Sequence, residues 1–137
     1  MKRPALAVLY LAFGLATGAF GAHGLRPHIS PDRLAVFQTG STYQVYAALS
    51  LLVLANYIDE EVGDWRPWWV VFAGSIVFSS SLYALSTTGI KFFGAVTPIG
   101  GALMIGSLVT LGISWLTAKT KSAPARVSDR SDCSRRS

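Results

Sequence analysis

The sequence predicts an all-α fold, an integral membrane bundle of four transmembrane helices built as two helical hairpins. The composition differs from that of a soluble domain, since 51% of the 137 residues are hydrophobic and only 14% are charged. Uncharged intervals also divide the chain, each longer than the roughly 20 residues that cross a bilayer core about 30 Å thick. These four intervals are residues 4–25, 34–58, 67–90 and 92–118.

A single domain and a tail account for the whole length. Residues 1–118 form the predicted transmembrane domain, and residues 119–137, which are rich in Ser and Arg, are expected to be a disordered polar tail. Start and stop signals place the predicted helices at about 4–22, 31–57, 67–88 and 98–118.

In the first segment, small residues recur at every fourth position, at Gly14, Gly18 and Ala22. On a helix they form one smooth stripe against which a neighbouring helix can approach closely. Lys2 and Arg3 followed by an apolar run are also typical of a secretory signal peptide. The run is long for that role and its stripe indicates packing, so a retained helix is favoured.

The residues between the first two segments predict a tight turn. Gly21 or Gly24 is expected to end the first helix in the left-handed conformation. Ser30, Pro31 and Asp32 then have the pattern of a helix start, with a hydroxyl cap, a proline that needs no N–H and an acid at the positive end. We therefore expect the first two helices to form a hairpin.

The second segment is the most polar of the four. At about 100° per residue, Gln38, Ser41 and Thr42 share one sector of a helix, and Gln44 lies a little further round. Much of this polarity is expected to face other helices or water, with hydrogen bonding between helices as the favoured role.

The third segment opens with aromatic residues around Pro67 that match the belt of amphipathic rings at a membrane interface. They are Trp65, Trp68 and Trp69. Further along, Ser75, Ser79 and Tyr83 recur every four residues and offer hydroxyls to a partner helix or to their own carbonyls. The segment holds no base that could activate a serine, so packing is the favoured role.

In the fourth segment, Thr97 and Pro98 repeat the cap-and-proline pattern and predict that the helix begins there. Small residues then recur every four positions, which predicts a packing face through most of the membrane depth. This stripe consists of Ala102, Gly106, Thr110 and Ser114.

The distribution of charge predicts location and orientation. Nine of the twelve Lys and Arg residues lie on the side that holds both termini and the second loop, and three lie on the other. Because basic loops stay in the cytoplasm, we expect a multi-pass protein of the cell inner (plasma) membrane with both termini cytoplasmic. Nucleic-acid binding is not indicated, since half of the basic residues sit in the last nineteen positions. The single cysteine, Cys133, can form neither an internal disulfide nor a zinc site.

Four short motifs fall at the corners of the predicted helices: GAFGAHGL at 18–25, YQVY at 43–46, SLY at 81–83 and TPIGG at 97–101. In this order and spacing they resemble the YgdD-like family of small membrane proteins, a domain of unknown function (DUF423). The resemblance covers nearly the whole chain except the tail. It implies a four-helix protein of the inner membrane, or of an organellar membrane in eukaryotes, with no established activity.

The chain departs from that family where its members often have Glu, Arg and His, because it has Gln38, Thr42 and Ala47. A Glu and an Arg four residues apart could pair inside the bundle, whereas neutral groups avoid burying a lone charge. The departure argues against a proton relay in this chain. The candidate polar residues are His23, Gln38, Thr42, Tyr43, Gln44, Ser79, Tyr83 and Thr97.

His23, at the edge of the membrane, is expected to cap or lie at the interface; proton or ligand handling is the second hypothesis. A metal site is the least favoured, because His28 and Asp32 alone leave the ligand set incomplete. We expect no catalytic residue, cofactor or metal.

The expected function is non-enzymatic: a compact bundle in the lipid bilayer that packs with itself as a homo-oligomer or with a larger membrane complex. The alternative is a small transporter or channel, as a dimer, for a neutral or lipid-like substrate, with a polar path along Gln38, Thr42 and Gln44. Cation or proton transport is disfavoured, because the four uncharged intervals contain no Asp or Glu. An enzyme is the third hypothesis, since no recognised nucleophile or metal spacing surrounds His23.

Overall fold

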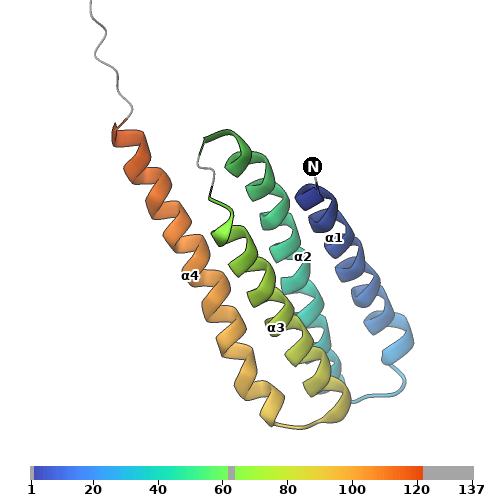
Figure 1. The fold of residues 1–137 in the computed structure, drawn as a ribbon. Coiled ribbons are helices and arrows are strands. Elements are labelled where there is room, and N and C mark those ends of the chain that lie inside the picture. The colour runs from blue at the N-terminus through green and yellow to red at the C-terminus, as the bar shows by residue number, and fades with distance from the viewer. Residues whose placement is uncertain (1, 62–63, 122–137) are drawn as a thin grey trace, which may run out of the picture.

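The computed structural model describes residues 2–61 and 64–121, and within them the fold consists of four long helices (Figure 1). A short π-helix, η1 at Gly21–Leu25, prolongs the first helix. Successive long helices run antiparallel, so the start of the first and the end of the last lie at the same end of the bundle, on opposite flanks. We call this end the terminal end and the opposite end the hairpin end. The long helices are α1 Lys2–Phe20, α2 Pro31–Glu61, α3 Arg66–Thr88 and α4 Phe92–Lys121.

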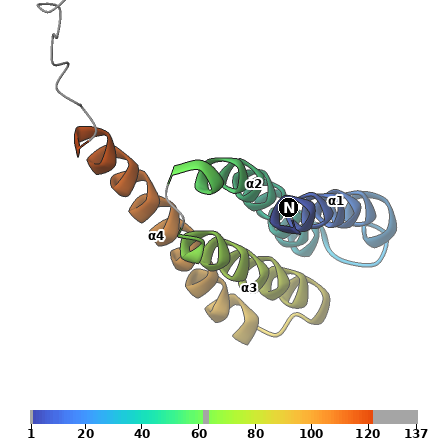
Figure 2. The ribbon, with the colours of Figure 1, turned by 45° about the horizontal axis from the view of Figure 1, so that its top comes forward.

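Each helix packs on the next in the chain: α1 on α2, α2 on α3 and α3 on α4. Figure 2 shows α2 and α3 in the middle, with α1 and α4 on opposite flanks. The last helix therefore leans mainly on α3. Near the terminal end it also reaches α2, where the rings of Tyr57 and Trp115 have centroids 5.4 Å apart.

In the described part of the chain, three helical segments are long and apolar enough to cross a membrane: Arg3–Leu25, Arg66–Thr88 and Phe92–Thr117. At 31 residues α2 has the length, but its polar side chains and terminal charges lower its hydropathy. The structure thus confirms an all-helical fold with membrane-spanning character in α1, α3 and α4.

The apolar core lies toward the terminal end, where Leu51, Ile58 and Val71 are fully buried around Trp68. The Trp68 indole Nε1 donates a 2.9 Å hydrogen bond to the Leu51 carbonyl. Trp68 thus belongs to the core and cannot face the headgroups as the predicted aromatic belt requires, whereas Trp69 is exposed and its place in such a belt stays a prediction. Adjacent residues on a helix point about 100° apart, so one tryptophan faces α2 while its neighbour faces outward.

The start of α2 agrees with the sequence pattern. The helix begins at Pro31, and the Leu34 N–H donates to the Ser30 carbonyl at 2.9 Å. The predicted start of the fourth helix at Pro98 is wrong, because α4 already begins at Phe92. Pro98 lies within the helix, where it removes one backbone hydrogen bond.

The hydroxyl of Thr97 has a different role from the predicted cap. It lies 2.9 Å from the Ser81 hydroxyl of α3 and donates to the Phe93 carbonyl at 3.1 Å. The predicted tail boundary also moves, since α4 continues to Lys121; residues 122–137 lie outside the described part of the chain.

The predicted left-handed helix end at Gly21 or Gly24 is wrong. Among the described residues Gly89 alone has a positive φ, of 76°, and its N–H caps α3 by donating to the Leu85 carbonyl. A Cβ on Gly21 would lie 2.8 Å from the Phe37 ring, and one on Gly24 would lie 2.8 Å from the Phe20 ring. These two glycines make room for aromatic rings while the helix continues as η1.

The small residues of α1 face α2. A Cβ on Gly14 would lie 3.2 Å from Val45, and one on Gly18 would lie 3.1 Å from the Ser41 hydroxyl. Ala22, one turn further, is half-buried in η1.

The small residues of α4 do not pack within the described chain in the same way. Ala102, Gly106 and Thr110 are exposed, and nothing lies within 4 Å of a Cβ built on Gly106. Ser114 is half-buried and donates to its own helix, at the Leu111 carbonyl.

The contact between α3 and α4 depends instead on Gly100. A Cβ there would lie 2.6 Å from the Phe78 backbone nitrogen and 2.7 Å from the Gly74 carbonyl oxygen. Gly100 and Ala102 point about 200° apart on the helix, so the face that meets α3 leaves the predicted stripe pointing away from it.

Candidate functional site

A chain of hydrogen bonds joins α1, α2 and α3 on the hairpin-end side of the apolar core. Gln44, only 1% exposed, accepts a 2.8 Å hydrogen bond at Oε1 from the Tyr83 hydroxyl. The Tyr83 oxygen lies 3.1 Å from the Thr17 hydroxyl. On its other side, Gln44 Nε2 donates to the Tyr10 carbonyl at 3.4 Å. We call these four residues, with Ser75 and Ser79, the polar network.

The hydroxyl groups of this cluster have fewer hydrogens to donate than there are acceptors within reach. Tyr83 has one hydroxyl hydrogen, which goes to Gln44, so Thr17 must donate if it is to reach Tyr83. The Thr17 hydroxyl is also 2.9 Å from the Gly14 carbonyl. Its single hydrogen can therefore be donated either to the Gly14 carbonyl or to the Tyr83 hydroxyl.

The second part of the network lies between α1 and α3. The Ser75 hydroxyl donates either to the Tyr10 hydroxyl, at 3.1 Å, or to the Phe72 carbonyl, at 2.9 Å. One turn along α3, Ser79 is 2% exposed, and its hydroxyl has no hydrogen-bond partner in the described structure.

The network contains an amide, phenols and aliphatic hydroxyls, and none of these groups changes charge near neutral pH. Such groups link helices in a bilayer by hydrogen bonds that lipid cannot offer. They also present neutral donors and acceptors. The arrangement therefore favours binding between helices over acid–base chemistry.

The polar path predicted along Gln38, Thr42 and Gln44 is not formed. Gln44 is buried between helices, whereas Gln38 and Thr42 are exposed. Thr42 and Gln44 point about 200° apart on one helix, which explains the separation. The structure does bring Gln44 and Tyr83 together.

His23 and His28 are both exposed at the hairpin end. Across residues 2–61 and 64–121, no group of three or more His, Cys, Asp and Glu side chains could hold a metal ion.

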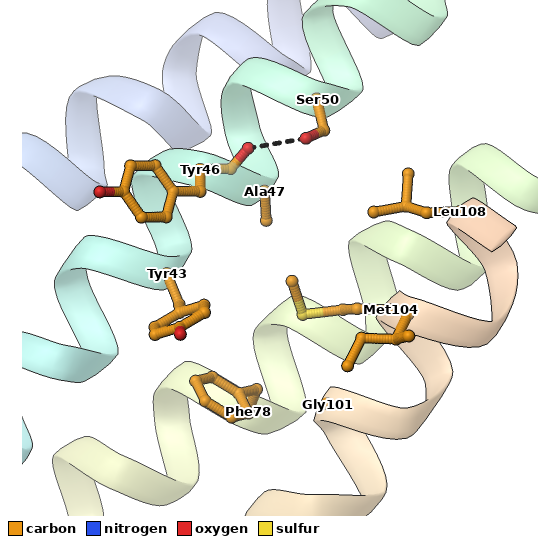
Figure 3. A pocket seen from close by; sticks show the side chains of 9 residues that line it. Tyr43, Tyr46, Ala47, Ser50, Phe78, Gly101, Met104 and Leu108 are labelled. Carbon is orange, nitrogen blue, oxygen red and sulfur yellow. Dashed lines mark hydrogen bonds between the residues drawn. The ribbon is translucent and has the colours of Figure 1, made fainter. Parts of the chain in front are cut away.

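A groove of about 370 Å³ opens between α2, α3 and α4 on the far side of α2 from the network (Figure 3). It exists because α4 packs on α3 and leaves α2 uncovered there. Tyr43 is 47% exposed along it, and the Ser50 hydroxyl donates to the Tyr46 carbonyl at 2.9 Å, so little polar capacity remains free. The lining consists of Tyr43, Tyr46, Ala47, Ser50, Phe78, Gly101, Met104, Ile105 and Leu108.

Sequence reasoning missed Tyr10, Thr17 and Arg33. The first two sit seven residues apart in an apolar segment and share a face with Gly14, and this spacing could have identified them. Arg33 caps the end of α3, where its Nη2 donates to the Thr87 carbonyl at 2.7 Å. No local sequence pattern predicts that contact, because its two residues are 54 positions apart.

Comparison with known proteins identifies a family that matches this chain. Residues 17–101 match the model of a protein family of unknown function, DUF423. No solved structure matches the chain significantly.

The curated relatives are described as UPF0382 membrane proteins. One, from Staphylococcus aureus (strain bovine RF122), is 43% identical over 111 residues, which cover 80% of this chain and 90% of the relative. YwdK of Bacillus subtilis (strain 168) is 45% identical over 109 residues, covering 77% and 81%. This chain therefore belongs to the DUF423 family of membrane proteins, whose function is not established.

Proposed function

We propose that this is a multi-pass protein of the inner membrane that performs no catalysis and acts by assembling with membrane partners through the exposed face of α4. All four helices cross the bilayer in this proposal, and both termini are cytoplasmic. One observation carries it: the small-residue stripe Ala102, Gly106 and Thr110 points away from its own bundle.

Crossing of the bilayer by α2 is supported by its neighbours. It packs between α1 and α3, both of which have transmembrane character. Its charges stay at its two ends, and the polar Ser41 and Gln44 are buried against other helices. These two buried polar groups do not meet lipid, so they do not prevent α2 from spanning.

Topology has a direct test. Single cysteines at Ser30 and Asp64, in a Cys133→Ser background, would be probed from each side with a membrane-impermeant thiol reagent. We expect labelling from opposite sides, with Asp64 on the cytoplasmic side. Labelling of both cysteines from the same side would mean that α2 does not cross.

The stripe on α4 favours a helix as its partner. Between helices in lipid, association depends on close packing, and small residues allow the backbones to approach. A stripe that faced only acyl chains would gain nothing from its lack of side chains. Since Gly106 has open space around it, a bulky residue there leaves the chain's own packing intact and blocks only a partner.

Assembly is tested with Gly106→Leu and its matched control Gly112→Leu. Gly112 lies on the same helix, also with nothing within 4 Å of a built Cβ, but points about 120° away. We expect wild type and Gly112→Leu to run as the same assembly on native gels after mild-detergent extraction, and Gly106→Leu to run smaller. An unchanged assembly in Gly106→Leu would overturn the proposal.

The identity of the partner follows from a cross-link. With Gly106→Cys in the Cys133→Ser background, a disulfide between two copies would indicate a homo-oligomer. A heavier adduct would indicate another membrane protein. A variant that forms neither, while native sizing shows a monomer, argues against assembly through α4.

A second candidate is transport of a neutral, lipid-like substrate, and the groove between α2, α3 and α4 is the observation that favours it. Purified protein in liposomes should then speed exchange of a fluorescent lipid between leaflets, and Ala47→Trp, which fills the groove, should slow it. Equal exchange in empty liposomes would exclude this function.

A further inference from the structure

A second cavity, of about 400 Å³, lies at the hairpin end, where η1 turns into α2. It is separate from both the polar network and the groove. Its polar lining comes from the exposed side chains of Arg26 and Gln38. Its apolar lining consists of Ala22, Ile29, Pro31, Leu34 and Ala35.

The position of this cavity gives it two environments. Arg26 directly follows Leu25, the last residue of the first candidate membrane span, and this would put the arginine at the edge of the bilayer. Gln38 lies about two turns into α2, and the apolar residues line the space between the two. The cavity therefore has a cationic mouth at the level of the headgroups and an apolar wall toward the hydrocarbon.

We propose that this cavity binds the phosphodiester headgroup of an anionic phospholipid, such as phosphatidylglycerol. Arg26 would pair with the phosphate, because a guanidinium offers a fork of donors that matches its oxygens. The Gln38 amide, which lies deeper, would hydrogen-bond to an ester carbonyl of the lipid, and the first carbons of the acyl chains would lie along Leu34 and Ala35.

The charges around the cavity favour an anion. No acidic side chain lines it. The single carboxylate on this side of the chain, Asp32, lines a different cavity together with Arg33, between the start of α2 and the end of α3. Arg33 is already bound to the Thr87 carbonyl. Arg26 is thus the single charged side chain in the lining of this cavity.

The apolar lining distinguishes a lipid from free phosphate. A site for an inorganic ion surrounds it with donors, whereas here the apolar side chains outnumber the two polar ones. Acyl carbons cover such a wall, and a small anion leaves it wet. This inference does not depend on the assembly face of α4, which lies on another helix.

Lipid binding is tested on the full chain in mild detergent by native mass spectrometry. The probes are dioleoyl-phosphatidylglycerol, dioleoyl-phosphatidylcholine and inorganic phosphate, each titrated separately. We expect one phosphatidylglycerol molecule to bind per chain, at a lower lipid concentration than phosphatidylcholine requires. Arg26→Gln, which removes one basic side chain, and Gln38→Glu, which adds one negative charge, should each weaken its binding about fivefold, the effect of about one unit of charge at an anionic surface. Arg26→Lys should restore most of the binding.

Lys91→Gln is the matched control, because Lys91 is exposed at the same end of the bundle and does not line the cavity. It should bind phosphatidylglycerol as wild type does. An equal loss in Lys91→Gln would show a diffuse surface attraction, and equal binding of the two lipids would show that charge is not recognised. Displacement of the lipid by inorganic phosphate would identify a free-anion site. Each of these three results would overturn the proposal.

Discussion

The Tyr83 hydroxyl donates a 2.8 Å hydrogen bond to Gln44 Oε1 in the interior of the bundle. The bond joins α3 to the one helix that lacks strong hydropathy of its own. Since Gln44 is almost completely buried, its amide has no water to turn to when this partner is removed.

Tyr83→Phe should therefore destabilise the protein by about 1 kcal/mol, the upper range for hydrogen bonds between membrane helices. Thermal unfolding in mild detergent, followed by circular dichroism, measures the change. Tyr43→Phe is the control and should change stability by less than about 0.5 kcal/mol, because Tyr43 faces the groove. The double variant Tyr83→Phe/Gln44→Leu should recover part of the loss. Additive losses would show that the two side chains are not coupled.

Gly100→Ala should weaken the contact between α3 and α4. Its Cβ would meet backbone atoms of Phe78 and Gly74, which cannot turn aside as a side chain can. We expect a loss of about 1–3 kcal/mol. Gly106→Ala on the same helix should be neutral or stabilising by up to about 1 kcal/mol, because alanine favours a helix and the space is open. Similar melting temperatures for the two variants would contradict this helix contact.

Arg33→Met should loosen the end of α3. The substitution keeps an unbranched apolar stem but removes the charge and the 2.7 Å hydrogen bond to the Thr87 carbonyl. Charge at a helix C-terminus and a charged hydrogen bond together suggest a loss of about 1–2 kcal/mol. Hydrogen exchange read by mass spectrometry should show faster exchange over residues 84–91. Lys91→Met, which removes an exposed charge nearby, should leave that exchange unchanged.

Trp68→Phe should destabilise the apolar core by about 1–3 kcal/mol. It removes the hydrogen bond to the Leu51 carbonyl and leaves a void among fully buried neighbours. Trp69→Phe should cost less than about 0.5 kcal/mol, since that ring is 47% exposed. Chemical unfolding of both variants compares them directly, and equal losses would mean that the two rings are equally buried.

Local chemistry made much of the fold predictable. Pro31 begins α2 as the pattern of hydroxyl, proline and acid predicts, and α3 begins one residue before Pro67. Pro98 misled the prediction, because it lies at the seventh residue of α4, where the helix continues although the proline removes one backbone hydrogen bond. What extends α4 to Phe92 is its contact with α3, and that information is not local.

The choice of a packing face could not be made from one helix. Gly100 and Gly106 point about 120° apart on α4, and a small residue on either face can receive a partner helix. Gly74 on α3 decides between them, because its carbonyl lies against Gly100. The same limit explains why Gln44 could be recognised as a polar candidate while two α1 residues of its network were missed: Tyr10, whose carbonyl accepts from Gln44, and Thr17, which pairs with Tyr83.

The modest hydropathy of α2 has a consequence for biogenesis. During synthesis the segment leaves the ribosome before Tyr83 exists to satisfy Gln44, while α1 is already available to cover Ser41 and part of the Gln44 amide. In the proposed four-span topology, membrane insertion of α2 would therefore depend on α1 entering with it as a hairpin, and the later insertion of α3 would stabilise it. The polar side chains of α2 would thus be buried in the order of synthesis, first against α1 and then against α3.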